Sequence, residues 1–141
     1  MAFENGSNSV IQARPDYRAD VYNSSCSIES TNLYGELKPK GTKFSDLLQD
    51  FYKVTLFGKI DLKSSNTGVV MTFRSVDNFV QHYLHFRAIN FGFVCLSLGE
   101  VEVPITKGTC MSILASLPFL CELAYIYDHA CLNHTEALVP Y

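Results

Sequence analysis

Two stretches of the chain carry apolar residues at the spacing of an α-helix. In the first stretch these residues recur every three or four positions, at Phe44, Leu47, Leu48 and Phe51. Thr42 can supply an N-cap oxygen, and Gly58 can end the helix because glycine adopts a positive φ without strain. The pattern predicts a helix over residues 43–57 with one buried face.

The second helical pattern lies near the C-terminus. Its apolar positions are Cys110, Ile113, Leu114, Leu117, Cys121, Ala124 and Tyr125. Thr109 can cap this helix, and Pro118 predicts either a kink or a second helix capped by Ser116. Residues 127–141 show no period, so we expect this apolar tail to dock on the protein's own core or on a neighbouring subunit.

Alternating polar and apolar residues predict strands between the two helices. Residues 59–63 alternate strictly, and residues 69–74 follow a turn, which predicts a hairpin. Residues 79–89 form a long strand with its odd and even positions on opposite faces. The nearly continuous apolar run at 93–98 is typical of a central strand buried on both faces, and a short strand follows at 101–103.

The N-terminal third gives weaker signals. Residues 1–18 lack periodicity and predict a flexible arm. Residues 19–28 predict an edge strand, and Gly35, Pro39 and Gly41 favour a loop over residues 30–43.

Together these elements predict one α+β domain over residues 19–141, with a C-terminal tail from about residue 127. We expect an antiparallel sheet of four to five strands with two helices packed on one face. The expected core consists of Leu47, Leu48, Phe51, Val70, Leu84, Phe86, Val94, Leu96, Ile113, Leu114 and Leu117.

Composition narrows the functional classes. Eleven basic against fourteen acidic residues give a net charge of −3, so we expect no direct binding to nucleic acid. The longest charge-free run, residues 108–121, is shorter than the ~20 residues that span a membrane, so we expect no membrane partner. The five cysteines are odd in number and form no CxxC pair, which favours free thiols in a reducing intracellular compartment.

Few side chains indicate a catalytic or metal-binding role, and we expect no cofactor. His82 and His85 would point to opposite faces of their strand, which is unsuitable for a metal pair. His129, Cys131 and His134 are better spaced, and with Asp128 they are the candidate ligands for one ion. Short His/Cys clusters of this kind more often occur without any metal site, so we expect no bound metal ion.

A thiol hydrolase or acyltransferase is the alternative function. It would need a cysteine thiolate activated by a histidine. Cys110, near a helix N-terminus, and His82, in a segment similar to the histidine box of small papain-like proteins, are the candidate pair. No third, orienting group is evident, and a satisfied core histidine is the more common role for His82.

Three segments resemble the small adenovirus early-region-four proteins of the open-reading-frame-three type. The segments are residues 45–50, 83–88 and 123–130. The resemblance implies a non-enzymatic viral accessory protein of the infected-cell nucleus, a small α+β domain that dimerises through its sheet. It also implies further assembly by exchange of C-terminal tails and capture of host regulatory proteins. This chain differs by its N-terminal arm and by an extra strand segment at 91–104.

The sequence therefore favours an interaction or assembly protein without catalysis, forming a dimer or a larger homo-oligomer and binding a host protein. Leu138, Val139 and Tyr141 are the candidate assembly residues of the tail. A viral coat or structural subunit is a further alternative. The N-terminal arm would suit a coat protein, but the acidic net charge is unsuited to wrapping a genome.

Overall fold

The computed structural model describes residues 14–64 and 68–132 and shows an α+β fold. Within these residues five strands form one sheet in the order β1-β2-β3-β4-β5. The strands are β1 (Tyr17–Tyr22), β2 (Ile28–Lys38), β3 (Val69–Val76), β4 (Phe79–Ala88) and β5 (Gly92–Glu102). The helices are α1 (Phe44–Ser64), the 3-10 helix η1 (Lys107–Thr109), α2 (Ser112–Ile126) and the π-helix η2 (Tyr127–Leu132).

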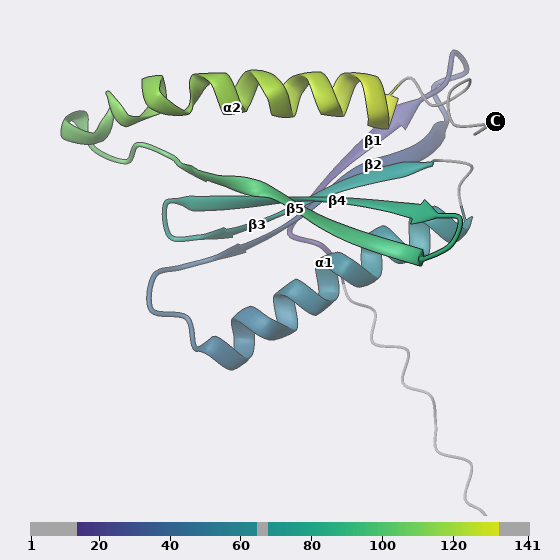
Figure 1. Cartoon of the computed structure of the whole chain (residues 1–141), viewed down its shortest axis with the longest axis horizontal. Coiled ribbons are helices and arrows are strands. Elements are labelled where there is room, and N and C mark those ends of the chain that lie inside the picture. The colour runs from purple at the N-terminus through teal and green to yellow at the C-terminus, as the bar shows by residue number, and fades with distance from the viewer. Residues whose placement is uncertain (1–13, 65–67, 133–141) are drawn as a thin grey trace, which may run out of the picture.

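The sheet is mixed, with helices on both faces. Strands β2 and β3 pair in parallel, and the other three strand pairs are antiparallel. A parallel pair needs a long crossover connection, and α1 supplies it. Helix α1 covers one face and α2 lies over the other (Figure 1). The prediction of both helices on one face was therefore wrong.

Strand β3 lies at the centre of the sheet and is buried on both faces. Val70 packs with Phe57 and Leu62 on the α1 side. Val69 and Met71 pack with residues of α2 and η2 on the other side. Neighbouring β3 residues point to opposite faces, so the strand divides the interior into two apolar clusters.

Helix α1 continues past the glycine that was expected to end it. Gly58 is buried inside the helix, and residues 59–63, predicted as a strand, form its last turns. A Cβ at Gly58 would lie 2.8 Å from Cγ and Cδ2 of His85 on β4. Gly58 is thus needed for close contact between helix and sheet. The predicted hairpin at this point does not form.

Strand β2 occupies most of the segment that was predicted as a loop. Four of its buried residues are polar or small: Thr31, Asn32, Gly35 and Glu36. A Cβ at Gly35 would overlap the Phe73 ring, so this glycine also serves close packing. Because its buried side chains are polar, β2 lacks the apolar alternation by which strands are recognised.

The edges of the sheet are β1 and β5. The expectation of an edge strand near residue 19 is confirmed, although β1 begins at Tyr17, inside the predicted arm. The expectation that residues 93–98 form a central strand was wrong, since Leu96 of β5 is half exposed. The long strand over residues 79–89 is confirmed as β4, and its Tyr83 and His85 face α1. Residues 1–13 of the arm lie outside the described residues.

The second helix is one continuous element with Pro118 inside it. It begins at Ser112 rather than beside Thr109, and Thr106 and Thr109 cap η1 instead. Residues 127–132, expected to begin the tail, extend the helix as η2. The Tyr127 hydroxyl donates to Asn32 Oδ1 at 2.8 Å, and Cys131 is buried against the sheet.

Several residues of the expected core are exposed. They are Leu48, Leu96, Leu114 and Leu117, each with about half of its surface accessible. Leu84 and Phe86 pack against the cluster on the α2 side, and Val70 is fully buried, as expected. The buried residue of α2 is Leu123, which the helical pattern did not single out.

Replacement of Leu123 by alanine is expected to lower the free energy of unfolding by about 2–5 kcal/mol, because the side chain is 6% exposed. Replacement of Leu114, which is 50% exposed, should cost less than about 1 kcal/mol. Urea denaturation at low protein concentration measures both losses. Equal losses would contradict this orientation of α2.

Replacement of Gly58 by alanine is expected to destabilise the fold, although alanine favours a helix by about 1 kcal/mol. The clash with His85 should cost more than this gain, since overpacking costs about 1–3 kcal/mol. Thermal unfolding tests the prediction, with Gly108→Ala as the control because a Cβ there meets only one atom, at 3.8 Å. A higher melting temperature for Gly58→Ala would refute the packing account.

Candidate functional site

The candidate thiol pair does not form a hydrogen bond in the described part of the chain. The His82 ring on β4 lies between Phe73 and Phe119, with centroid distances of 6.4 and 6.2 Å. Burial lowers the pKa of His82, and its Nδ1 atom has no hydrogen-bond partner among the described residues. Cys110 is exposed after η1, where its thiol donates to the Thr106 carbonyl at 3.4 Å. The geometry shows no activated nucleophile at these positions.

The candidate metal ligands do not gather around one point. His129 Nδ1 lies 3.5 Å from Asp128 Oδ2, but Cys131 is directed elsewhere. His129 stacks on Tyr125 at 4.0 Å between ring centroids, on the exposed side of the helix. Cys131 points into the protein, where burial raises the pKa of its thiol to about 12. His134 lies outside the described residues, and residues 14–64 and 68–132 hold no group of three possible ligands. The tail residues Leu138, Val139 and Tyr141 also lie outside them.

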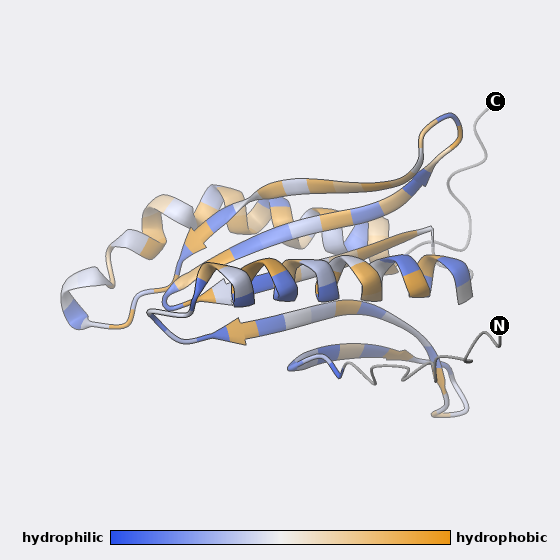
Figure 2. Cartoon of the chain, turned by 90° about the horizontal axis from the view of Figure 1, so that it is seen from below, coloured by the Kyte–Doolittle hydropathy of each residue, from blue (hydrophilic) through white to orange (hydrophobic). Residues whose placement is uncertain are grey.

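The most distinctive surface is the outward side of α2. We call it the α2 outer face, and it consists of Met111, Leu114, Leu117, Pro118, Cys121 and Tyr125. Positions 111, 114, 118, 121 and 125 alternate in steps of three and four, which is the spacing of a coiled-coil seam. Glu122 is the only charged residue of the helix. This helix is mostly apolar, whereas α1 mixes polar and apolar residues along its length (Figure 2).

The inner side of α2 borders an apolar groove of about 380 Å³. Leu120, Leu123 and Tyr127 form its helical wall, and Phe73 and His82 belong to the sheet wall. His82 therefore lies in an apolar groove rather than beside an exposed thiol. The groove and the α2 outer face together leave much apolar surface around one helix.

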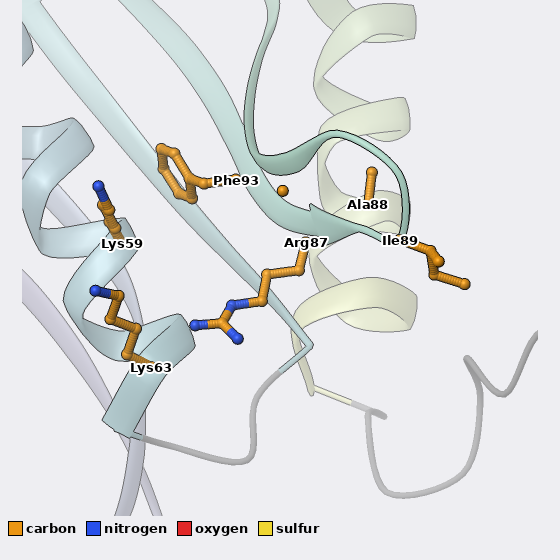
Figure 3. A pocket seen from close by; sticks show the side chains of 7 residues that line it. Lys59, Lys63, Arg87, Ala88, Ile89 and Phe93 are labelled. Carbon is orange, nitrogen blue, oxygen red and sulfur yellow. The ribbon is translucent and has the colours of Figure 1, made fainter.

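A cleft of different character lies at the far end of α1. We call it the basic cleft, and its volume is about 540 Å³. The cleft is lined by Lys59 and Lys63 of α1, by Arg87, Ala88 and Ile89 at the end of β4, and by Gly92 and Phe93 at the start of β5 (Figure 3). The lysines are four residues apart and share one helix side. Lys59 Nζ lies 6.0 Å from the centre of the Phe93 ring.

Sequence reasoning missed the basic cleft because it assigned residues 59–63 to a strand. The structure instead places Lys59 and Lys63 in the last turns of α1, where they line the same cleft as Arg87. The α2 outer face was missed because the helical pattern counted Leu114 and Leu117 as buried.

A pair of buried carboxyl groups lies beneath the start of α1. Asp50 is bound by Lys38 and Lys53, at 3.5 and 3.4 Å. In the part of the chain that the structure describes, the Oε1 atom of Glu36 on β2 has no hydrogen-bond partner. Burial, assisted by nearby Asp16, raises the pKa of Glu36 to about 7. Neither carboxyl lines the groove or the cleft, so we assign neither to a functional site.

No family model matches the chain, and no curated protein or solved structure matches it either. The resemblance to the adenovirus proteins therefore stays a prediction. In the described residues no helix is long and apolar enough to cross a membrane.

The Glu36→Gln variant is expected to melt roughly 5 °C higher than the wild type at pH 8. A carboxyl whose pKa is raised by folding stabilises the protein below pH 4.5 and loses that contribution as the pH rises through about 7. Glutamine does not ionise, so the variant does not lose stability in this way. Melting curves from pH 4 to 9 measure the difference in melting temperature, with Glu29→Gln at an exposed position of β2 as the control. Parallel profiles for wild type and Glu36→Gln would contradict the burial of an ionisable Glu36.

Proposed function

We propose that the protein acts without catalysis, as a subunit that associates with copies of itself through the α2 outer face. The observation that carries the proposal is the composition of α2. A helix that is apolar on every side is normally buried on every side, yet the sheet covers only one side of α2. An apolar stripe of this length on a surface indicates an interface.

A second copy of the chain is the partner that fits this face best. The stripe has the spacing of a helix–helix seam, and such seams are complementary to themselves. The α2 outer face has no charged residue, and helix α2 as a whole has one, Glu122, so the face offers no charge pattern that would select a different protein. In a two-fold pairing of antiparallel helices, Cys121 near the middle of α2 would lie close to Cys121 of the second copy.

The biological role follows from the resemblance and is part of the proposal. In an infected cell the assembly would present many copies of one surface and so bind host regulatory proteins by multivalent contact. The free thiols agree with the reducing interior of a cell. The C-terminal residues beyond Leu132 would extend the assembly, as the apolar tail sequence predicts.

Light scattering after size-exclusion chromatography tests the interface. The full chain is expected to be a dimer or larger, and Leu114→Glu should shift it to monomer because the charge would be buried in the seam. The matched control is Leu48→Glu on α1, since Leu48 and Leu114 are equally exposed, at 52% and 50%. A monomeric wild type, or equal dissociation by both variants, would overturn the proposal.

Two further samples separate the helix from the tail. Mild oxidation should link two chains through Cys121, and Cys121→Ser should prevent the link while Cys26→Ser should not. A chain ending at Leu132 keeps Cys131 and the Tyr127–Asn32 bond, so it should remain folded. If this chain is monomeric while Leu114→Glu stays associated, the tail rather than α2 forms the interface.

A further inference from the structure

Three cations converge on the basic cleft, in a protein whose net charge is −3. Lys59 and Lys63 come from the last turns of α1, and Arg87 comes from the end of β4. The Arg87 side chain extends from β4 toward the part of α1 that carries Lys59 and Lys63 (Figure 3), and all three side chains line the cleft. Like charges repel when they are brought together without a counter-ion. A cluster of this kind is therefore expected to hold an anion.

Within residues 14–64 and 68–132, the cations of the cleft lack the acidic partners that four other basic residues have. Among the described residues Arg18, Lys38, Lys40 and Lys53 each pair with an aspartate. No such pair involves the three cleft residues in this part of the chain. Asp61, which lies between the two lysines in sequence, binds the Tyr34 hydroxyl instead. None of the described residues that line the cleft carries a carboxylate.

The cleft also has an apolar wall. Phe93 and Ile89 line it, and the Phe93 ring stacks on buried His85 at 5.6 Å with an angle of 9°. The His85 ring is fixed in turn by Thr72, whose Oγ1 lies 2.7 Å from Nε2. Phe93 is thus a rigid platform behind the cations. The volume of about 540 Å³ is within the range of small-molecule sites.

We infer that the basic cleft binds a phosphorylated organic molecule, with Lys59, Lys63 and Arg87 holding the phosphate and Phe93 and Ile89 contacting the organic part. A phosphate monoester carries about two negative charges on one compact group, which suits three convergent cations. Arginine binds such a group through two parallel hydrogen bonds, and lysine adds a point charge. An extended nucleic acid would need a longer basic track.

This chemistry has two possible sources, a soluble phosphate ester and the headgroup of a phosphorylated lipid. The turn beside the cleft presents Ile89 and Phe91 to solvent, at 80% and 84% exposed. Apolar side chains beside a cationic site can enter the boundary of a lipid surface, which needs no membrane-spanning helix. The same phosphate contacts serve both sources.

Two binding measurements test the inference. The first is calorimetric titration with inositol trisphosphate. The second is co-sedimentation with phosphatidylcholine vesicles that contain or lack phosphatidylinositol bisphosphate. Lys63→Glu and Arg87→Glu should each weaken binding at least about tenfold, and added salt should weaken it further. Lys107→Glu is the matched control, because Lys107 is an exposed lysine in η1 on another part of the surface. Circular dichroism confirms that each variant is folded.

The variant Phe91→Ser separates the two sources. If the protein binds inositol trisphosphate and Phe91→Ser leaves that binding unchanged, the ligand is a soluble phosphate ester. If the protein binds only the vesicles that contain the bisphosphate lipid and Phe91→Ser weakens that binding, the ligand is a lipid headgroup. Either result supports the inference. It is overturned if neither probe binds, or if Lys107→Glu weakens binding as much as the cleft variants. These measurements do not depend on the oligomeric state, so they stand apart from the test of the α2 outer face.

Discussion

The structure depends on the burial of β3 from both sides. Four consecutive residues, Val69 to Thr72, are almost inaccessible to solvent. Consecutive residues of a strand point to opposite faces, so such a segment is stable only if each face is covered. Helix α1 covers one face, and α2 with η2 covers the other. The parallel pairing of β2 and β3 follows, since the crossover between them is α1 itself.

The two faces differ in chemistry, and the difference bears on function. The α1 side holds buried polar groups, among them Glu36, Asp50 and the His85–Thr72 pair. These groups fix the position of α1 and so place its last two lysines beside the 87–93 turn. The α2 side is mainly apolar, although Asn32 bonds to Tyr127 and Cys131 there and His82 lines its groove. The helix that covers it stays apolar on its outer side. One surface therefore suits an anion and the other suits a second protein.

The sequence indicated the regular elements and missed those shaped by contacts between distant residues. The alternation of β4 and the presence of a helix at α2 are local signals and were predicted correctly, whereas the buried face of that helix was not. Strand β2 was missed because Asn32 and Glu36 are polar yet buried, and α1 was cut short because Gly58 serves packing against His85 instead of ending the helix. Both candidate surfaces depend on such contacts. The basic cleft needs the full length of α1, and the α2 outer face needs the rotation that buries Leu123.

The central claim is that a second copy of the chain covers the outward side of α2. Hydrogen–deuterium exchange of the full chain at low and high protein concentration tests it most directly, because association protects the amides of an interface. The account predicts that residues 112–126 gain protection as the concentration rises, while residues 44–64 of α1 exchange at the same rate. Unchanged exchange in α2, or equal protection of α1, would contradict it.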